Sequence, residues 1–361
     1  MLIERLETIP YALPFRETYV TARGRLDRRE LLLVRLHTSG GPVGLGEAAP
    51  LALRGGATLE QIERELHQSC APLLEGTKLT THSLPGLIAA ARTRGVSGPA
   101  LAAVDLALHD LAGKIEGEPV WRLLGAARAG PVRCNATLVA GKPADVAAAA
   151  VKWAAEGFGT LKLKVGLPDD VRQVGAVREA VGPGTRLRVD ANGAWSVAEA
   201  IERLDAMARH ELELAEQPAG DLAAMARVRR AVRTLVAADE SVVHAGDAER
   251  ALELGACDVA TVKVAKVGGI AAGLEVAREI PVYLSSALDG PVGIAGAAHL
   301  AQLLPLVEPA AGLAHGLATG RLLAATIAAR GPELEGDALR LPDEPGLGVE
   351  IDELALARCR L

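Results

Sequence analysis

The feature that most constrains the fold is a regular alternation that begins after Pro131. Short β-branched or Leu-rich runs alternate with Ala-rich runs of helical periodicity, and Gly or Pro separates them. This alternation predicts a parallel sheet, and the number of units favours a closed (β/α) barrel. The expected strands are 160–165, 186–190, 212–216, 235–239, 258–263, 281–286 and a stretch near 307–313.

Helices are expected between these strands, and two of them carry capping signals. Ser196 with Glu199 three residues later predicts a capping box, and Asp247 is expected to cap the helix that ends at Gly255. The expected helices are 143–156, 169–181, 196–210, 221–232, 247–255, 270–279 and 290–304.

The first 120 residues follow a different pattern. Two strands are expected at 29–37 and 43–48, joined by a Ser-Gly-Gly-Pro turn. Helical periodicity follows at 58–75, with Thr58 as N-cap, and again at 98–117. We therefore predict an α+β domain over 1–120, a barrel domain over 121–328, and a polar, turn-rich segment over 329–361 that returns to the first domain.

Composition excludes several classes of protein. Half of the chain is apolar, which is too much for a disordered protein. The net charge is 39 − 45 = −6 and only eight residues are aromatic, so the chain offers neither a basic surface nor a stacking platform for nucleic acid. We expect no nucleic-acid partner.

Cysteine spacing and hydropathy indicate the cellular compartment in which the protein is expected. Four scattered cysteines, without CxxC spacing, predict neither a zinc site nor a disulfide framework. The uncharged stretch 290–307 contains two prolines, a histidine and three glycines, and we interpret it as a buried helix rather than a membrane span. The first ten residues lack the regions of a signal peptide, so we expect a cytoplasmic protein without membrane association.

Five charged residues end five successive expected strands, 23 to 26 residues apart, close to one β/α unit. The strand ends of such a barrel share one mouth, where active sites lie. We therefore expect these side chains to converge. They are Lys164, Asp190, Glu216, Asp239 and Lys263.

The chemistry of this set is specific. Three converging carboxylates repel one another unless a cation lies between them, and oxygen ligands without His or Cys favour Mg²⁺ over zinc. Lys164 and Lys263 come one strand before and one strand after the carboxylates, so they would face each other across the site. A partly desolvated lysine can act as a base. The set predicts proton abstraction α to a substrate carboxylate.

Neighbouring residues are less constrained. Lys162 shares a strand face with Lys164 and is expected to support the base electrostatically. Asn192 is either a turn-former or a residue beside the metal. Lys266 is expected to lie in a loop or at a helix start, and His315 is expected to line the mouth.

These motifs resemble the enolase superfamily, specifically its muconate-lactonizing-enzyme subgroup. The matching pieces are Lys-Leu-Lys at 162–164, Val-Asp-Ala-Asn-Gly at 189–193, Glu-Gln-Pro at 216–218, Ala-Asp-Glu-Ser at 238–241, Val-Lys-Val-Ala-Lys-Val-Gly-Gly at 262–269, and Gly-Glu-Ala-Ala-Pro at 46–50, which matches the N-terminal capping domain of the family.

The resemblance covers nearly the whole chain and implies roles for the spaced series. It implies a capping domain over a modified (β/α)8 TIM-type barrel. It also implies Mg²⁺, with Mn²⁺ as a substitute, held by Asp190, Glu216 and Asp239. Lys164 and Lys263 would be the acid/base lysines.

Within the subgroup, local features are most like o-succinylbenzoate synthase. They are Asn-Ala-Thr at 135–137, the segment 285–295 and Gly-Leu-Ala-Thr at 316–319. This likeness implies a lyase of menaquinone biosynthesis that dehydrates a cyclohexadiene carboxylate, with Lys164 as base. Asn135, Ser285 and Ser286 are candidate substrate contacts, and segment 285–293 would bind a second carboxylate through its hydroxyls and a helix N-terminus.

The alternative is an isomerase that racemises an N-acylamino acid or epimerises a dipeptide, with the two lysines as opposed bases. Similar dipeptide epimerases carry Asp-x-Asp near the eighth strand, whereas 310–319 contains no acid, which argues against a cationic dipeptide. A cycloisomerase and a non-catalytic barrel protein are further alternatives.

Specificity is expected from the capping domain. The loop 15–29 should close over the site, with Arg25 or Tyr19 contacting a small-molecule carboxylate. The sequence is compatible with a homo-oligomer and does not specify its size.

Overall fold

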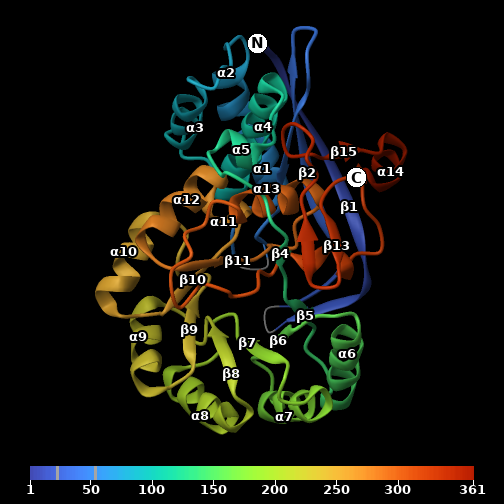
Figure 1. Cartoon of the computed structure of the whole chain (residues 1–361). Coiled ribbons are helices and arrows are strands. Elements are labelled where there is room, and N and C mark those ends of the chain that lie inside the picture. Colours follow the sequence, from blue (N-terminus) through green and yellow to red (C-terminus); the bar gives the residue numbers. More distant parts are fainter. Residues whose placement is uncertain (22–23, 53–54) are drawn as a thin grey trace.

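A parallel sheet of seven strands organises the larger part of the molecule (Figure 1). The computed structural model describes residues 1–21, 24–52 and 55–361. Neighbouring strands of the sheet are consecutive in sequence. They are β5 (Ala136–Leu138), β6 (Thr160–Lys164), β7 (Arg186–Asp190), β8 (Leu212–Glu216), β9 (Leu235–Ala238), β10 (Val259–Val262) and β11 (Val282–Leu284).

Helices follow these strands and cover the outside of the sheet (Figure 1). Successive side chains of a strand point to opposite faces. Apolar side chains such as Leu161 and Leu163 belong to the core shared with the helices, while Lys162 and Lys164 lie on the other face of β6. The helices are α6 (Pro143–Ala155), α7 (Asp170–Val181), α8 (Val197–Met207) with the 3₁₀ turn η3 (Ala208–His210), α9 (Leu222–Ala231), α10 (Ala245–Leu254), α11 (Val264–Val267), α12 (Ile270–Glu279) and α13 (Pro291–Ala301).

The sheet closes through two residues instead of an eighth strand. His315 forms a parallel bridge to Cys134, just before β5, and Gly316 forms one to Ser285, just after β11. The predicted strand at 307–313 is wrong, because this stretch consists of turns. Its Ala310 and Leu313 pack against Leu214 and Tyr283 inside the barrel, so they contribute to the core rather than to the ladder.

Two capping predictions can be compared with the structure. The capping box of Ser196 and Glu199 is present. The prediction for Asp247 is wrong by three residues, because His244 is the N-cap of α10 and Asp247 returns the second bond of that box. A histidine ring nitrogen can accept the same backbone hydrogen bond as the usual Ser or Asp oxygen.

An antiparallel sheet and a helical layer form the cap (Figure 1). The expected helices at 58–75 and 98–117 are present, the first with Thr58 as N-cap and one π-helical turn inside it. The helix α3 is an addition to the prediction. The elements are β1 (Ile3–Thr21), β2 (Gly24–Thr38), β3 (Gly44–Ala48), α1 (Leu59–Glu65), η2 (Leu66–Cys70), α2 (Ala71–Leu74), α3 (Leu84–Arg92), α4 (Gly98–Glu116) and α5 (Val120–Leu123).

The predicted loop 15–29 is wrong for the residues that the structure describes. Residues 15–21 and 24–29 form the ends of β1 and β2, which pair from Ile3 with Thr38 to Thr21 with Gly24, and 22–23 lie outside the described residues. The hairpin is long enough to run from the cap to the barrel (Figure 1). Extended backbone pairing across two strands, rather than a flexible loop, therefore holds the cap residues that face the barrel mouth.

The C-terminal segment contacts both parts of the molecule. The strand β14 pairs with β4, which leads into the barrel, while Arg35 of the cap binds Glu353 in α14 at 2.6 Å. The segment therefore packs on the cap, as expected, and also on the start of the barrel. Its elements, with β4, are β4 (Val132–Arg133), η4 (Ala318–Leu322), β12 (Ala328–Arg330), β13 (Glu333–Glu335), β14 (Ala338–Arg340), β15 (Glu350–Ile351) and α14 (Glu353–Cys359).

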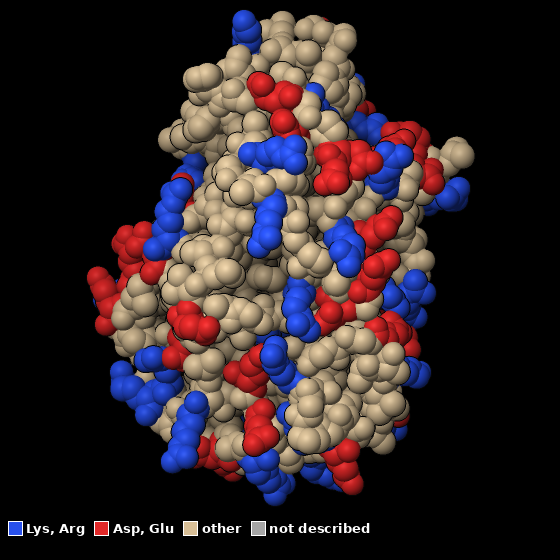
Figure 2. All heavy atoms as spheres, viewed as in Figure 1, with Lys and Arg blue, Asp and Glu red and all other residues tan. Residues whose placement is uncertain are grey.

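In the described part of the chain, no helix combines the length and the apolar character needed to cross a membrane. The uncharged stretch after Gly290 is the buried helix α13, only 11 residues long. On the face shown in Figure 2, Lys and Arg side chains lie interspersed with Asp and Glu.

Candidate active site

The five charged residues predicted at the strand ends are brought together. Asp190 lies directly beside Lys164 on one neighbouring strand and beside Glu216 on the other. Asp239 and Lys263 follow β9 and β10 directly. None of the five is more than 4 % exposed. The arrangement follows from the parallel register, which places the carboxyl ends of all strands at one mouth.

Lysine ammonium groups neutralise the three carboxylates. Lys164 Nζ lies 2.5 Å from Asp190 Oδ2. Lys162, one layer deeper in the barrel, donates to both oxygens of Glu216 at 2.7 and 2.8 Å and lies 3.0 Å from Asp190. Lys263 forms a short ion pair with Asp239. Lys162 therefore contacts two of the three carboxylates from the strand face that it shares with Lys164.

Burial and charge shift the pKa values in opposite directions. Burial alone would lower the pKa of Lys162, but the carboxylates of Asp190 and Glu216 raise it well above its ordinary value. Burial would raise the pKa of Asp190, but Lys162 and Lys164 hold it well below its usual range. Burial and the nearby Asp190 raise the pKa of Glu216. Neighbouring charges, as well as burial, therefore set the pKa values of these groups.

Two neighbouring residues, Lys266 and Asn192, also contact the charged cluster. Lys266 lies in the short helix α11, but its buried ammonium binds Asp239 Oδ1 at 3.0 Å and two backbone carbonyls beside the site. Asn192 is part of the site as well as a turn-former. Its φ is +48°, its Oδ1 accepts from Lys164 at 3.2 Å, and its backbone N–H donates to Asp190 at 3.0 Å.

A second polar layer lies beneath the mouth. The Tyr283 hydroxyl donates a short hydrogen bond to Glu216 Oε2, and Thr261 donates to Tyr283 at 2.8 Å. The guanidinium of Arg188, which is fully buried, lies 5.0 Å from the centre of the Tyr283 ring. Sequence reasoning missed this layer. The available signal was strand alternation, because Arg188 and Tyr283 come two residues before Asp190 and Ser285.

Asp190, Glu216 and Asp239 are the candidate ligands for a metal ion at the mouth. Across residues 1–21, 24–52 and 55–361, no three His, Cys, Asp or Glu side chains already converge as ligands around one point, because the lysine ammonium groups occupy the carboxylate oxygens. The donor chemistry fits a hard divalent cation, however. The three carboxylates are buried and come from adjacent strand ends, and burial, followed by the nearby Asp190, raises the pKa of Glu216.

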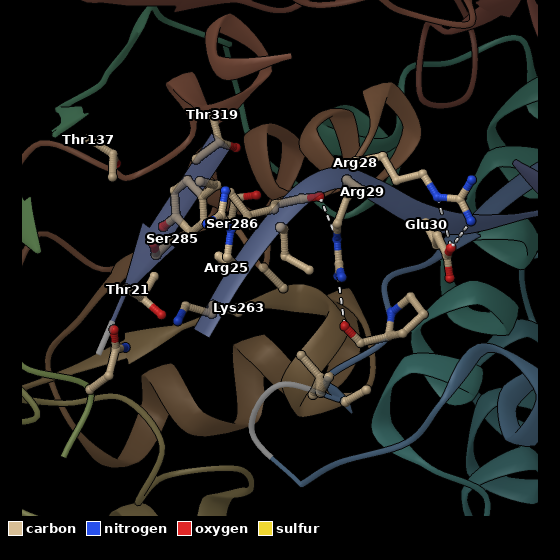
Figure 3. Close-up of a pocket in the computed structure, with 18 of the residues that line it drawn as sticks. Thr21, Arg25, Arg28, Arg29, Glu30, Thr137, Lys263, Ser285, Ser286 and Thr319 are labelled. Carbon is tan, nitrogen blue, oxygen red and sulfur yellow. Dashed lines mark hydrogen bonds and ion pairs between the residues drawn. The ribbon is translucent and has the colours of Figure 1, made fainter. Parts of the chain in front are cut away.

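A cavity of about 720 Å³ opens above this cluster between cap and barrel (Figure 3). Both candidate base lysines, Lys164 and Lys263, line it, as do Ser285 and Ser286. Thr137 and Thr319 add hydroxyl groups to the barrel side. The hairpin supplies the other wall, including Tyr19 and Arg25.

Arg25 and Arg29 differ in burial. The Arg25 side chain is 72 % exposed and lies 3.9 Å from Asp27 at the rim. Arg29 is buried, and it donates to the carbonyl oxygens of Leu288 and Pro50 at 3.1 and 2.8 Å (Figure 3). Arg29 therefore ties the hairpin to the loop after β11, while Arg25 is the one of the two placed at the solvent side of the cavity.

Two predicted residues are not brought to the cavity. Asn135 is 1 % exposed, and its Oδ1 accepts from Arg188 at 3.5 Å in the layer below. His315 is half-buried, and its Nδ1 accepts the Leu284 N–H at 2.9 Å. Burial and Arg188 lower the pKa of His315 to about 4, so the ring is a neutral part of the barrel closure rather than a mouth residue.

The N-terminus of α13 is not available to a substrate carboxylate, contrary to the prediction for segment 285–293. Glu47, from the cap strand β3, accepts the N–H groups of Gly290, Val292 and Gly293 at 2.7, 3.3 and 3.2 Å. A carboxylate from the protein thus occupies the anion site that a helix N-terminus offers. Of the groups in segment 285–293 that were predicted to bind this carboxylate, the Ser285 and Ser286 side chains line the cavity.

Family models match both parts of the chain. Residues 145–355 match the model described as enolase C-terminal domain-like, and residues 6–125 match the mandelate racemase / muconate lactonizing enzyme N-terminal domain.

Similar proteins include dipeptide epimerases and an o-succinylbenzoate synthase. The chain is 30 % identical to the L-Ala-D/L-Glu epimerase of Bacillus subtilis over 97 % of each chain. It is 41 % identical to the o-succinylbenzoate synthase of Thermobifida fusca, over 54 % of this chain and 62 % of the relative. A dipeptide epimerase of Enterococcus faecalis, complexed with Mg and the dipeptide L-Leu-L-Tyr, aligns with a TM-score of 0.90 at 30 % identity, over 97 % of this chain and all of that one.

Proposed function

The chain belongs to the enolase superfamily, in its muconate-lactonizing-enzyme subgroup, and we propose that it is an isomerase that inverts the α-carbon of a substituted amino acid carboxylate. The observation that carries this proposal is the placement of Lys164 and Lys263 on one cavity, with the carboxylates of β7, β8 and β9 between them. The similarity to an epimerase over 97 % of both chains supports an isomerase over a lyase.

Two opposed lysines account for inversion. One lysine, as the free amine, takes the α-proton from one face of the substrate, and the electron pair of the C–H bond passes into the adjacent carboxylate. The other lysine, as the ammonium, delivers a proton to the opposite face. The roles exchange for the reverse direction. General acid–base catalysis by positioned groups contributes about 10²- to 10⁴-fold in rate.

The three carboxylates would hold Mg²⁺, or Mn²⁺ in its place. Asp190, Glu216 and Asp239 are the ligands in this proposal, and Lys162 would keep Glu216 ionised. When bound, the cation would offset the negative charge that develops on the substrate carboxylate.

The cavity favours a substrate without a free ammonium group. Residues 310–319, next to the barrel closure, contain no acid. On the hairpin, Asp27 and Glu30 already pair with Arg25 and Arg28 at 3.9 and 2.6 Å. An N-acylated amino acid therefore fits this charge balance better than a dipeptide with its cationic terminus.

Solvent exchange tests the isomerase. Purified protein with Mg²⁺ is incubated in D₂O with single enantiomers of N-acylamino acids and with dipeptides, and ¹H NMR and polarimetry follow the α-position. We expect loss of the α-proton signal together with inversion for an N-acylamino acid. Absence of both with every compound would refute the isomerase.

A dehydratase is the second candidate, because the relative with 41 % identity is an o-succinylbenzoate synthase. Here Lys164 would remove the α-proton and the β-hydroxyl would leave as water, while Lys263 would stay an ammonium across the ring. The lyase predicts that Lys263→Arg retains activity, whereas inversion needs a proton donor and acceptor at this position. A direct assay of the cyclohexadiene carboxylate separates the two reactions.

A further inference from the structure

We propose that Tyr283 is a positioning residue that orients the Glu216 carboxylate and thereby determines the affinity of the mouth for a divalent cation. This inference rests on the cation site put forward under the proposed function. It concerns a residue outside the cavity, since Tyr283 is 1 % exposed and lies in the layer below the strand ends.

The hydrogen bonds around Tyr283 have one consistent direction. Thr261 donates to the phenol oxygen at 2.8 Å, so the phenol hydrogen is free to point at Glu216 Oε2, which accepts it. An ionised carboxylate has no hydrogen of its own to donate. The chain of donors therefore runs from Thr261 through Tyr283 to Glu216.

Packing keeps this chain in place. Thr261 is fully buried and Glu216 is 1 % exposed, so bulk water has no access to replace a lost bond. The Arg188 guanidinium lies 5.0 Å from the ring centre and fixes the position of the ring through a cation–π contact. The three strands β7, β10 and β11 thus act together on the Glu216 carboxylate of β8.

The bond to Tyr283 leaves Glu216 able to bind a cation. Each carboxylate oxygen can accept more than one partner. The phenol therefore restricts rotation of the Glu216 carboxylate and leaves a lone pair of Oε2 for a cation. Lys162 contacts both oxygens as a charged partner, so it would compete with a metal for them. The neutral phenol adds no charge to compete. Hydrogen bonds that hold metal ligands from behind typically change metal affinity about 10- to 100-fold.

The test is calorimetric titration of purified full-length protein with MgCl₂. We expect Tyr283→Phe to weaken the Mg²⁺ affinity by at least about tenfold, because the ring remains and only the hydroxyl is removed. Tyr11→Phe is the matched control. Tyr11 is equally buried and also donates to a buried glutamate, Glu47, at 2.8 Å, but outside the mouth. We expect its Kd to stay within about twofold of the wild type.

Each possible outcome of the Mg²⁺ titrations bears on one part of the proposal. A Tyr283→Phe variant that binds Mg²⁺ as tightly as the wild type overturns the positioning role and leaves the cation site standing. Equal weakening by Tyr283→Phe and Tyr11→Phe also overturns it, because the effect would then be general destabilisation. A wild type without saturable Mg²⁺ binding overturns the cation site itself.

A second variant covers the case in which Tyr283→Phe does not fold. Thr261→Val keeps the shape of the side chain and the whole tyrosine but removes the donor behind it. We expect an affinity loss of about threefold. An unchanged Kd for Thr261→Val, with the fold intact by circular dichroism, would contradict the proposal.

Discussion

Glu216 and Glu47 are both almost fully buried and both accept a hydrogen bond from a buried tyrosine, yet their other partners differ in kind. Glu216, at the barrel mouth, is bound by the ammonium of Lys162. Glu47, between cap and barrel, is bound by backbone N–H groups of α13. Side-chain ammonium groups can move aside for a ligand, whereas backbone N–H groups are part of the fold.

This difference distinguishes a chemical role from a structural one. In the proposed function, the charged side chains at the mouth exchange partners and transfer protons. The Glu47 cluster joins β3 to α13 and so holds the cap on the barrel next to the cavity. Sequence reasoning had assigned a substrate-binding role to the helix N-terminus that Glu47 occupies.

The largest expected effect is on chemistry at the mouth. Lys164→Ala and Lys263→Ala should each lower α-proton exchange and inversion by about 10³-fold, because each removes one of the two proton carriers. Lys114→Ala is the control, since Lys114 pairs with the buried Asp110 at 2.6 Å in the cap. Lys114→Ala should lower the free energy of unfolding and leave the rate of turnover unchanged. NMR in D₂O measures all three, and retained inversion in either mouth variant would contradict the two-base proposal.

A matched pair of glutamate variants tests the comparison directly. Glu216→Gln should weaken Mg²⁺ binding by at least about tenfold, because it neutralises one of three proposed carboxylate ligands. Glu47→Gln should leave the Mg²⁺ affinity within about twofold, since the side chain is not at the mouth. Calorimetric titration gives both values. Similar losses in the two variants would mean that the two clusters are not separate in function.

The pH dependence of stability should reveal Glu47. Burial, and then the nearby Asp289, raise the pKa of Glu47 to about 7 from an ordinary 4.5. Between these two values the folded chain keeps a proton that the unfolded chain has lost, so the free energy of unfolding falls as pH rises through this window. The wild type should lose about 2 kcal/mol relative to Glu47→Gln between pH 5 and 8. Urea unfolding at several pH values measures this, and parallel curves for the two proteins would disagree with it.

The smallest expected effect concerns packing around Glu47. A Cβ at Gly290 would lie 2.6 Å from Glu47 Oε2 and against the Tyr11 hydroxyl, so Gly290→Ala should cost about 1 to 2 kcal/mol in unfolding free energy. Gly220→Ala is the control, because a Cβ there meets no atom within 4 Å. Thermal unfolding compares the two, and equal stability would show that the cluster tolerates rearrangement.

The local and periodic features were predictable. The β/α alternation and the five strand-end charges follow from the sequence, because a parallel barrel brings equivalent positions of successive strands to one mouth. Lys162 was predictable from strand alternation, and the same reasoning applied to Tyr283 and Arg188 would have exposed the second layer. The stretch 15–29 was predicted as a loop, whereas its described residues extend β1 and β2 through pairing between the two strands.

What the sequence by itself determined is therefore the fold class, the family and the charged residues at the mouth, since each depends on spacing along the chain. Only the tertiary structure decided the partners of those charges. Glu47 meets Gly290 across 243 residues, and Tyr283 meets Glu216 across 67. It also decided that two residues, rather than a strand, close the barrel. Hydrogen bonds between distant residues depend on how the elements pack, and no local pattern encodes them.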